Sequence, residues 1–192
     1  QDVRTQFPAG DWSGRFRAVT AARTLVAHHP TVFDVVEGDG EGENGDPRLL
    51  GLVVSLVASA ASDKRSVVQT NGLRCMVELF SCAVGETLSA EDIAILVRAT
   101  YGCHKSCKGF IVAETKNAMD AAVANMDPVE LLNGAVLPQA LEKHPKVNGQ
   151  GAIYMDKCLQ RLEAGGVLPA VLADGAISLE SLLPALAKGA TS

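Results

Sequence analysis

The hydrophobic positions along the chain recur at steps of three and four residues, which is the spacing of one face of an α-helix. In the first such segment, residues 13–28, these positions are Phe16, Val19, Ala22 and Val26. Pro30 follows closely enough to end a helix there. Further helices are expected at 47–62, 67–84, 90–101, 110–125, 128–143, 149–164 and 178–188. No convincing alternating strand of five or more residues is present, so the pattern predicts an all-α chain.

The helix ends and connections add detail to this prediction. Asp46 followed by Pro47 is typical of a helix start, because Asp caps free backbone N–H groups and Pro fits the first turn. Pro138 and Pro184 fall inside two expected helices and should kink or shorten them. The stretch 165–177 is ambiguous and has room for one more short helix. Most connections are short, so we expect neighbouring helices to be antiparallel.

Three of the expected helices share a pattern. A β-branched residue is followed eight residues later by a methionine in the pairs Val68 and Met76, Ile111 and Met119, and Val147 and Met155. A small residue stands four positions after the first member of each pair: Gly72, Thr115 and Gly151. These offsets share one helix face, where a small residue lets a neighbouring helix approach closely. The pattern recurs after 43 and then 36 residues, which fits the period of HEAT-type helical hairpins.

We therefore predict an α-solenoid of antiparallel helical hairpins with about four and a half HEAT repeats. The alternative is that any amphipathic helix has such a face and that the repeated methionines are a coincidence. The segments before the repeated helices favour the repeat, because each helix is entered through a short basic turn. The cations of these turns are Lys64 and Arg65, then Lys105 and Lys108, then Lys143 and Lys146.

Corresponding turns line up along one edge of a stack of hairpins. The six cations are therefore expected to form a stripe that attracts an acidic partner. The alternative is that these are ordinary solvated polar turns. Trp12, the only tryptophan, stands at the entry of the first helix. It is either a core residue or a partly exposed interface residue, a role in which tryptophan is enriched.

Charge and composition narrow the possible classes of protein. The net charge is −5, and five acids lie in the Gly-rich stretch 37–46 with no basic residue, so the rest of the chain is near neutral. We expect this stretch to be a mobile loop. The five cysteines are expected to be free thiols, as in a reducing compartment. Gln1 in place of Met indicates a piece of a longer chain, and no signal peptide is visible. The longest apolar run, Leu49 to Ala61, is too short to span a membrane.

Catalytic and metal sites have little support in the sequence. Cys103, His104 and Cys107 are close together, and His144 lies in the next turn. One pair of cysteines with a distant histidine is weak support for zinc, and no oxyanion donor or orienting acid accompanies a Cys–His pair. The glycines of 38–42 follow no clear strand and are interleaved with acids, so they form a poor phosphate site. We expect no enzyme activity, catalytic residue, cofactor or metal, and neither nucleic acid nor a membrane as partner.

Four segments, in order along the chain, resemble the turns and following helices of TOG domains, the tubulin-binding HEAT arrays of microtubule regulators. They are Asp11-Trp12-Ser13-Gly14-Arg15-Phe16-Arg17-Ala18, Ser62-Asp63-Lys64-Arg65-Ser66-Val67-Val68, His104 to Ile111 with Ala113-Glu114-Thr115-Lys116-Asn117-Ala118-Met119, and His144-Pro145-Lys146-Val147-Asn148. The ordered set of four carries the resemblance, which spans residues 11–188. The third and fourth segments look closest to the crescerin, or TOG array, proteins of cilia. The resemblance implies that residues 1–192 form a single TOG-like domain with an acidic loop at about 37–46.

The resemblance also implies a function. In TOG domains the turn edge binds the side of an αβ-tubulin heterodimer, and the tryptophan of the first turn packs against tubulin. The matching positions here are Trp12, Lys64, Arg65, Lys105, Lys108, Lys146 and Asn148. The resemblance implies a cytoplasmic, cytoskeletal protein of the ciliary axoneme that regulates or anchors microtubules. The chain departs from the six repeats of a full TOG domain, and the acidic insert is unusual. The alternative is a HEAT scaffold that binds a non-tubulin protein within an axonemal complex.

Overall fold

A computed structural model describes residues 11–33 and 47–189, and this part of the chain contains helices and no strand. The α-helices are α1 (Trp12–His28), α2 (Pro47–Ala61), α3 (Ser66–Ser81), α4 (Ala90–His104), α5 (Gly109–Asn125), α6 (Pro128–Leu131), α7 (Leu137–Ala140), α8 (Pro145–Ala164), α9 (Leu168–Ala173) and α10 (Leu179–Gly189). Short 3-10 helices η2 (Pro30–Phe33) and η3 (Ala83–Thr87) and the π-helix η4 (Leu132–Val136) complete the set. The all-α prediction is confirmed for these residues. The acidic loop at 37–46 and the predicted cap Asp46 lie outside the described residues.

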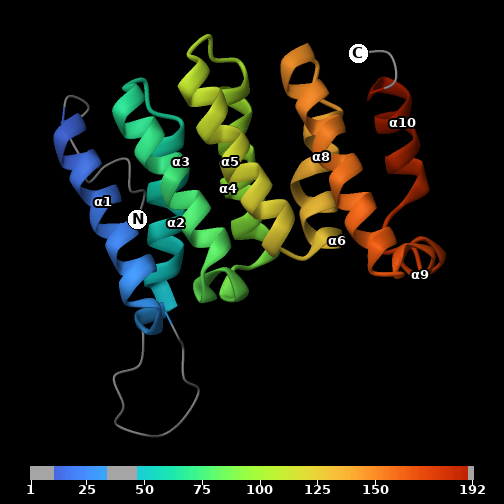
Figure 1. Cartoon of the computed structure of the whole chain (residues 1–192), viewed down its shortest axis with the longest axis horizontal. Helices are drawn as coiled ribbons and strands as arrows, with labels where there is room; N and C mark the ends of the chain where they lie inside the picture. Colours follow the sequence, from blue (N-terminus) through green and yellow to red (C-terminus); the bar gives the residue numbers. More distant parts are fainter. Residues whose placement is uncertain (1–10, 34–46, 190–192) are drawn as a thin grey trace, which may run out of the picture.

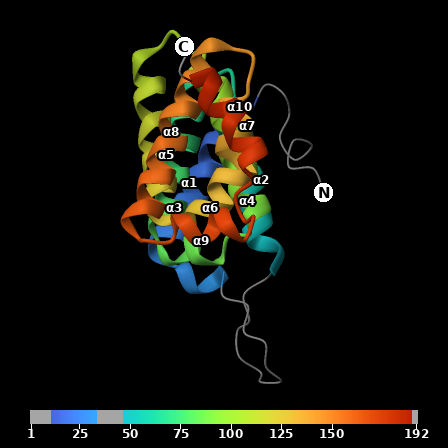
Figure 2. The same cartoon turned by 90° about the vertical axis from the view of Figure 1, so that its right-hand side faces the viewer.

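The helices form two layers (Figures 1 and 2). One layer consists of α1, α3, α5 and α8, each in contact with the next. The other consists of α2, α4, the α6–η4–α7 segment and α10, again packed in chain order. Consecutive helices across the layers pack as pairs, namely α2 with α3, α4 with α5, and α7 with α8. The described chain is therefore a row of helical hairpins.

The repeated residues lie in the seam between the two layers. Val68, Ile111, Val147 and the three methionines that follow them are all buried. A Cβ at Gly72 would lie only 2.7 Å from the Ala61 backbone nitrogen, and one at Gly151 would lie even closer to that of Ala140. The small residue thus lets the second helix of the hairpin approach the end of the first, as its position in the sequence predicts.

The three turns that enter α3, α5 and α8 share one backbone geometry. Arg65, Lys108 and His144 precede these helices with extended backbone, at ψ 113°, 108° and 120°. The carbonyl oxygen of each accepts hydrogen bonds from the N–H groups three and four residues later. All three stand at the same distance before the first repeated residue, so the sequence repeat marks a structural repeat of the turn.

The segment expected as one helix over 128–143 is interrupted by the π-turn η4. Pro138 has no N–H to donate to the carbonyl of Gly134, which would otherwise pair with it in an α-helix. Arg98 of α4 donates to Gly134 O instead, at 3.2 Å, and the Tyr101 hydroxyl donates to Ala135 O. Two side chains of the neighbouring helix therefore satisfy the carbonyls around the proline, and the helix continues as α7.

The C-terminal part resolves two further expectations. The ambiguous stretch 165–177 contains α9, and Gly166 and Gly175 stand on either side of it with positive φ (69° and 79°). Glycine adopts this conformation readily, which explains the two glycines. Pro184 lies inside α10 and does not end it, because α10 continues to Gly189.

Candidate protein-interaction edge

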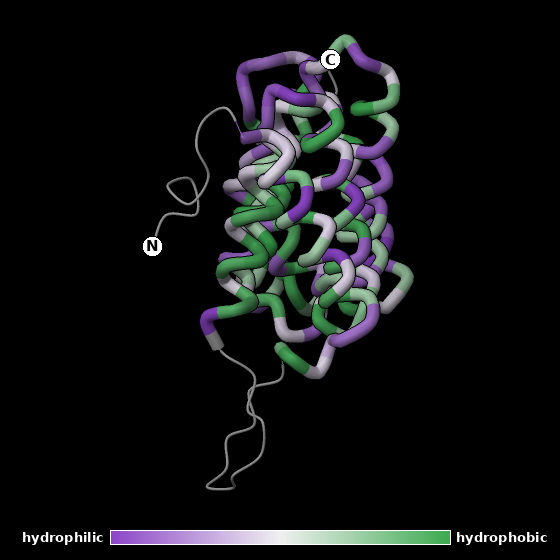
Figure 3. The backbone as a smooth tube through the Cα atoms, turned by 90° about the vertical axis from the view of Figure 1, so that its left-hand side faces the viewer, coloured by the Kyte–Doolittle hydropathy of each residue, from purple (hydrophilic) through white to green (hydrophobic). Residues whose placement is uncertain are grey.

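The turns that enter α1, α3, α5 and α8 all lie along one side of the row of hairpins, the upper side in Figure 1. We call this side the turn edge and define it by residues 11–12, 62–65, 105–108 and 141–146. Figure 3 shows hydrophobic segments through the body of the stack and several strongly hydrophilic segments on this side. The edge exists because every helix of the first layer begins on the same side of the stack.

In the first turn, Asp11 caps α1. Its carboxylate accepts a hydrogen bond from Gly14 N at 2.7 Å. Such a cap fixes where the helix starts and so fixes the direction of the next residue. Trp12, the first residue of α1, is 41% exposed. Of the two interpretations of Trp12, the structure therefore favours the partly exposed one.

In the second turn, Asp63 holds the chain and leaves the cations free. Its carboxylate accepts from Arg15 Nε of α1 at 2.8 Å and from the Arg65 backbone N–H at 2.7 Å. The Arg15 contact joins the first turn to the second. The side chains of Lys64 and Arg65 are exposed to solvent.

The third turn has the same internal bond in a weaker form. The hydroxyl of Ser106, which stands where the second turn has Asp63, accepts from the Lys108 backbone N–H at 3.1 Å. Lys105 and Lys108 are exposed. In the fourth turn Lys146 is exposed as well, but so is the acid Glu142. Lys143 is exposed there too, and Lys188 Nζ of α10 donates to the carbonyl oxygens of Leu141 and Glu142.

Asn148 does not belong to the exposed edge, contrary to the sequence-based expectation. It is only 2% exposed, and its side-chain amide donates to Ala140 O at the end of the preceding helix. Gln69, at the equivalent position of α3, donates in the same way to Ala61 O at 2.9 Å. Asn148 thus ties the two helices of a hairpin together, and a partner has no access to it.

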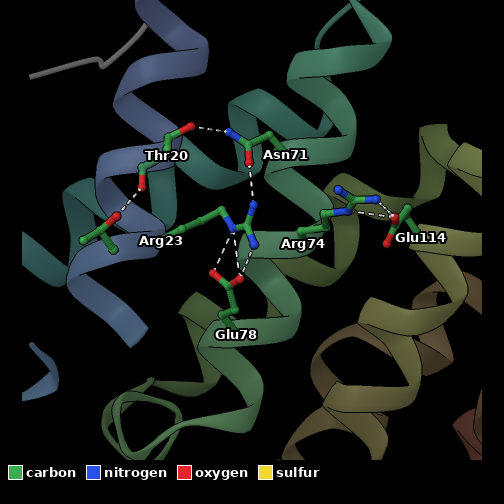
Figure 4. A network of polar contacts seen from close by, with 7 residues as sticks. Thr20, Arg23, Asn71, Arg74, Glu78 and Glu114 are labelled. Carbon is green, nitrogen blue, oxygen red and sulfur yellow. Dashed lines mark hydrogen bonds and ion pairs between the residues drawn. The ribbon is translucent and has the colours of Figure 1, made fainter. Parts of the chain in front are cut away.

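The edge cations differ from the cations on the outer face of the first layer. There, charges pair between successive helices: Arg23 with Glu78 and Arg74 with Glu114 (Figure 4). Lys157 pairs with Asp120 in the same way between α8 and α5. Within residues 11–33 and 47–189, no ion pair involves the edge cations Lys64, Arg65, Lys105, Lys108, Lys143 and Lys146. The positive charge of these six side chains is therefore not neutralised by an ion pair within the described residues.

Two exposed hydrophobic residues beside the edge were not expected from the sequence. Val67 is 47% and Phe110 is 53% exposed. Each directly precedes the first repeated residue of its helix, as Lys146 does in α8. That shared position was the signal that could have identified them, because it lies one residue before a buried position on the helix.

The cysteine and histidine cluster is built as part of the core. Cys103 is buried, its thiol donates to Ala61 O at 3.2 Å, and burial raises its pKa. Burial lowers the pKa of His104 to about 4, so its ring is neutral near pH 7. Cys107 is exposed, and all five cysteines, which lie in the described ranges, are free. Among the described residues no group of three or more His, Cys, Asp or Glu side chains could hold a metal ion.

None of the described helices is long and apolar enough to cross a bilayer. The fold and the edge thus define a class: a row of helical hairpins that presents aligned basic turns. Comparison of the sequence with models of known protein families and with curated proteins gives no match.

Proposed function

We propose that this chain is a non-catalytic TOG-type HEAT-repeat module that binds tubulin or microtubules through the turn edge. The observation that carries the proposal is the alignment of four turns that expose Trp12 and six unpaired basic side chains along one side of the stack. Antiparallel hairpins bring these turns to one side, and the exposed Trp12 and basic side chains there are what distinguish this side as a binding surface.

The physical properties of the edge fit an acidic protein surface. Exposed Lys and Arg side chains steer an acidic partner and fix its orientation, and each contributes little affinity by itself. A partly exposed tryptophan can supply more, because its loss from an interface commonly costs about 2 kcal/mol or more. The resemblance to TOG domains implies αβ-tubulin as this partner and the ciliary axoneme as the location, and both are part of the proposal.

Purified tubulin tests the proposal directly. We expect the chain to form a complex with tubulin in gel filtration, or to co-sediment with microtubules. Replacing Trp12, Lys64 and Lys108 together by Ala should abolish the complex while the helical content measured by circular dichroism stays the same. Unchanged binding by this variant would exclude the turn edge as the binding surface.

A second candidate is a HEAT scaffold that binds a non-tubulin protein. The fourth turn favours it, because Glu142 is exposed there and Asn148, a contact position by resemblance, is buried. Pull-down with the immobilised chain separates the candidates. A defined non-tubulin protein that is recovered without tubulin, and that is lost with the same triple variant, would favour the scaffold.

A further inference from the structure

A groove of about 660 Å³ runs between α5 and α8, beside the third and fourth turns. Its walls include Val112 of α5, 39% exposed, and Ile153 of α8, 49% exposed. The space is open because α8 has small residues there. A Cβ at Gly149 would meet nothing within 4 Å beyond the adjacent residues and backbone of its own helix. The two helices therefore leave an accessible apolar slot between them.

An equivalent groove of about 420 Å³ lies nearer the N-terminal end of the row, where α3 packs between α1 and α5. Matched by position in the repeat, Gly149 corresponds to Thr70 and Ile153 to Arg74. The α3 groove is crossed by a polar network in which Arg23 binds both Glu78 and Asn71 (Figure 4). Polar side chains thus line the α3 groove at Thr70 and Arg74, where the α5–α8 groove has Gly149 and Ile153.

The residues around the α5–α8 groove determine the electric charge at each of its ends. His104 lies among its lining residues and is uncharged near pH 7, because burial lowers its pKa to about 4. Lys146 lines the end near the turns, and Lys105 is exposed on the turn that contributes Ser106 to the lining. Asp156 lies on the same helix, further from the turn edge. The groove is therefore apolar inside, basic at the turn edge and acidic at its far end.

We propose that this groove binds an acidic protein segment that inserts one large apolar side chain between Val112 and Ile153. The carboxylates of the segment lie beside Lys146 and Lys105, and its apolar side chain points away from the turn edge. The interaction surface thus extends from the turn edge onto the outer face of the first layer. The inference deepens the proposed function and rests on it insofar as one partner contacts both places.

The test uses the full chain, labelled with ¹⁵N, and a synthetic peptide of Glu and Gly residues with one central Phe. A second peptide has Ser in place of Phe. We expect saturable amide shifts at Val112, Gly149 and Ile153 with the Phe peptide at millimolar concentration, and no saturable shifts with the Ser peptide. Absence of these shifts, or equal shifts with both peptides, would overturn the proposal.

Gly149→Leu gives a second, independent readout, because a Cβ at this position enters open space and the longer side chain would occupy the groove that Gly149 lines. The matched control is Gly51→Leu, at an equally open position on α2 in the other layer. Gly149→Leu should abolish the Phe-dependent shifts and Gly51→Leu should retain them. Retention in Gly149→Leu would also overturn the proposal.

Comparing tubulin binding with binding of the Phe peptide distinguishes this inference from the proposed function. If tubulin does not bind the chain but the Phe peptide occupies the groove, the tubulin assignment fails and the groove stands. If tubulin binding depends on Lys64 and Lys108 but the Phe peptide leaves the groove amides unmoved, the turn edge stands and the groove proposal is overturned.

Discussion

Two residues in the first turn of α8 have opposite roles in this structure. Lys146 is exposed at the turn edge, whereas Asn148, two residues later, is buried and bonded to Ala140 O. Two steps along a helix rotate a side chain by roughly half a turn. A sequence motif that includes both residues therefore mixes one surface position with one structural position.

The pair Asn148→Ala and Lys146→Ala tests this division. Asn148→Ala should lower the free energy of unfolding by about 1–3 kcal/mol, because it removes a buried hydrogen bond and leaves an acceptor without it. It should leave the affinity for tubulin unchanged. Lys146→Ala should have the reverse effect, with nearly unchanged unfolding in urea and weaker binding. A loss of affinity in a folded Asn148→Ala protein would contradict the assignment.

His104 predicts how stability depends on pH. Its pKa is about 4 in the folded chain, below the ordinary value of 6.5, because burial disfavours the charged ring. Between these values the unfolded chain binds a proton that the folded chain does not, so acid favours unfolding. The contribution of His104 should be fully present at pH 7 and about 2 kcal/mol smaller at pH 5.

Urea unfolding at pH 7 and pH 5 measures this effect. His104→Gln should be less stable than the native sequence at pH 7, but its stability should fall less between the two pH values. An equal pH dependence of the two proteins would show that His104 is not buried in the neutral form.

At the scale of the element, the helices were predictable and some of their joints were not. The hydrophobic spacing and the turn residues gave nearly all helix positions, because an amphipathic helix carries its own signal. The π-turn before Pro138 could not be predicted, because its carbonyls are satisfied by Arg98 and Tyr101 from another helix. The exposure of Val67 and Phe110 was not predicted, because hydrophobic residues are normally assigned to the core, although their position one residue before a buried repeat position was a usable signal.

Two glycines of α8 give a matched prediction for the packing of a hairpin. Alanine at an open helical glycine should stabilise the protein by up to about 1 kcal/mol, as expected for Gly149→Ala. Gly151→Ala should instead destabilise it by about 2 kcal/mol or more, because its Cβ would overlap the backbone of Ala140. Thermal unfolding of the two variants measures the difference. Equal midpoints would mean that α7 and α8 are not in close contact at Gly151.

At the scale of the whole molecule, repetition converts weak local features into one surface. A single Lys in a turn is unremarkable and is usually just solvated. The second, third and fourth turns each place cations on the same side of the stack, and the first adds Trp12. The sequence indicated this edge because the repeat aligns the turns. It did not indicate the α5–α8 groove, because that space depends on which side chains of two helices face each other.

The affinity of the full chain for tubulin, compared between two charge-reversed variants, tests the central claim most directly. One variant is Lys108→Glu, at the turn edge, and the other is Arg48→Glu, which also reverses a charge, at an exposed position in the first turn of α2 on the side of the stack opposite the turn edge (Figure 1). We predict a dissociation constant raised about tenfold for Lys108→Glu, and one within about twofold of the native sequence for Arg48→Glu. Equal affinities for the two variants would contradict the account.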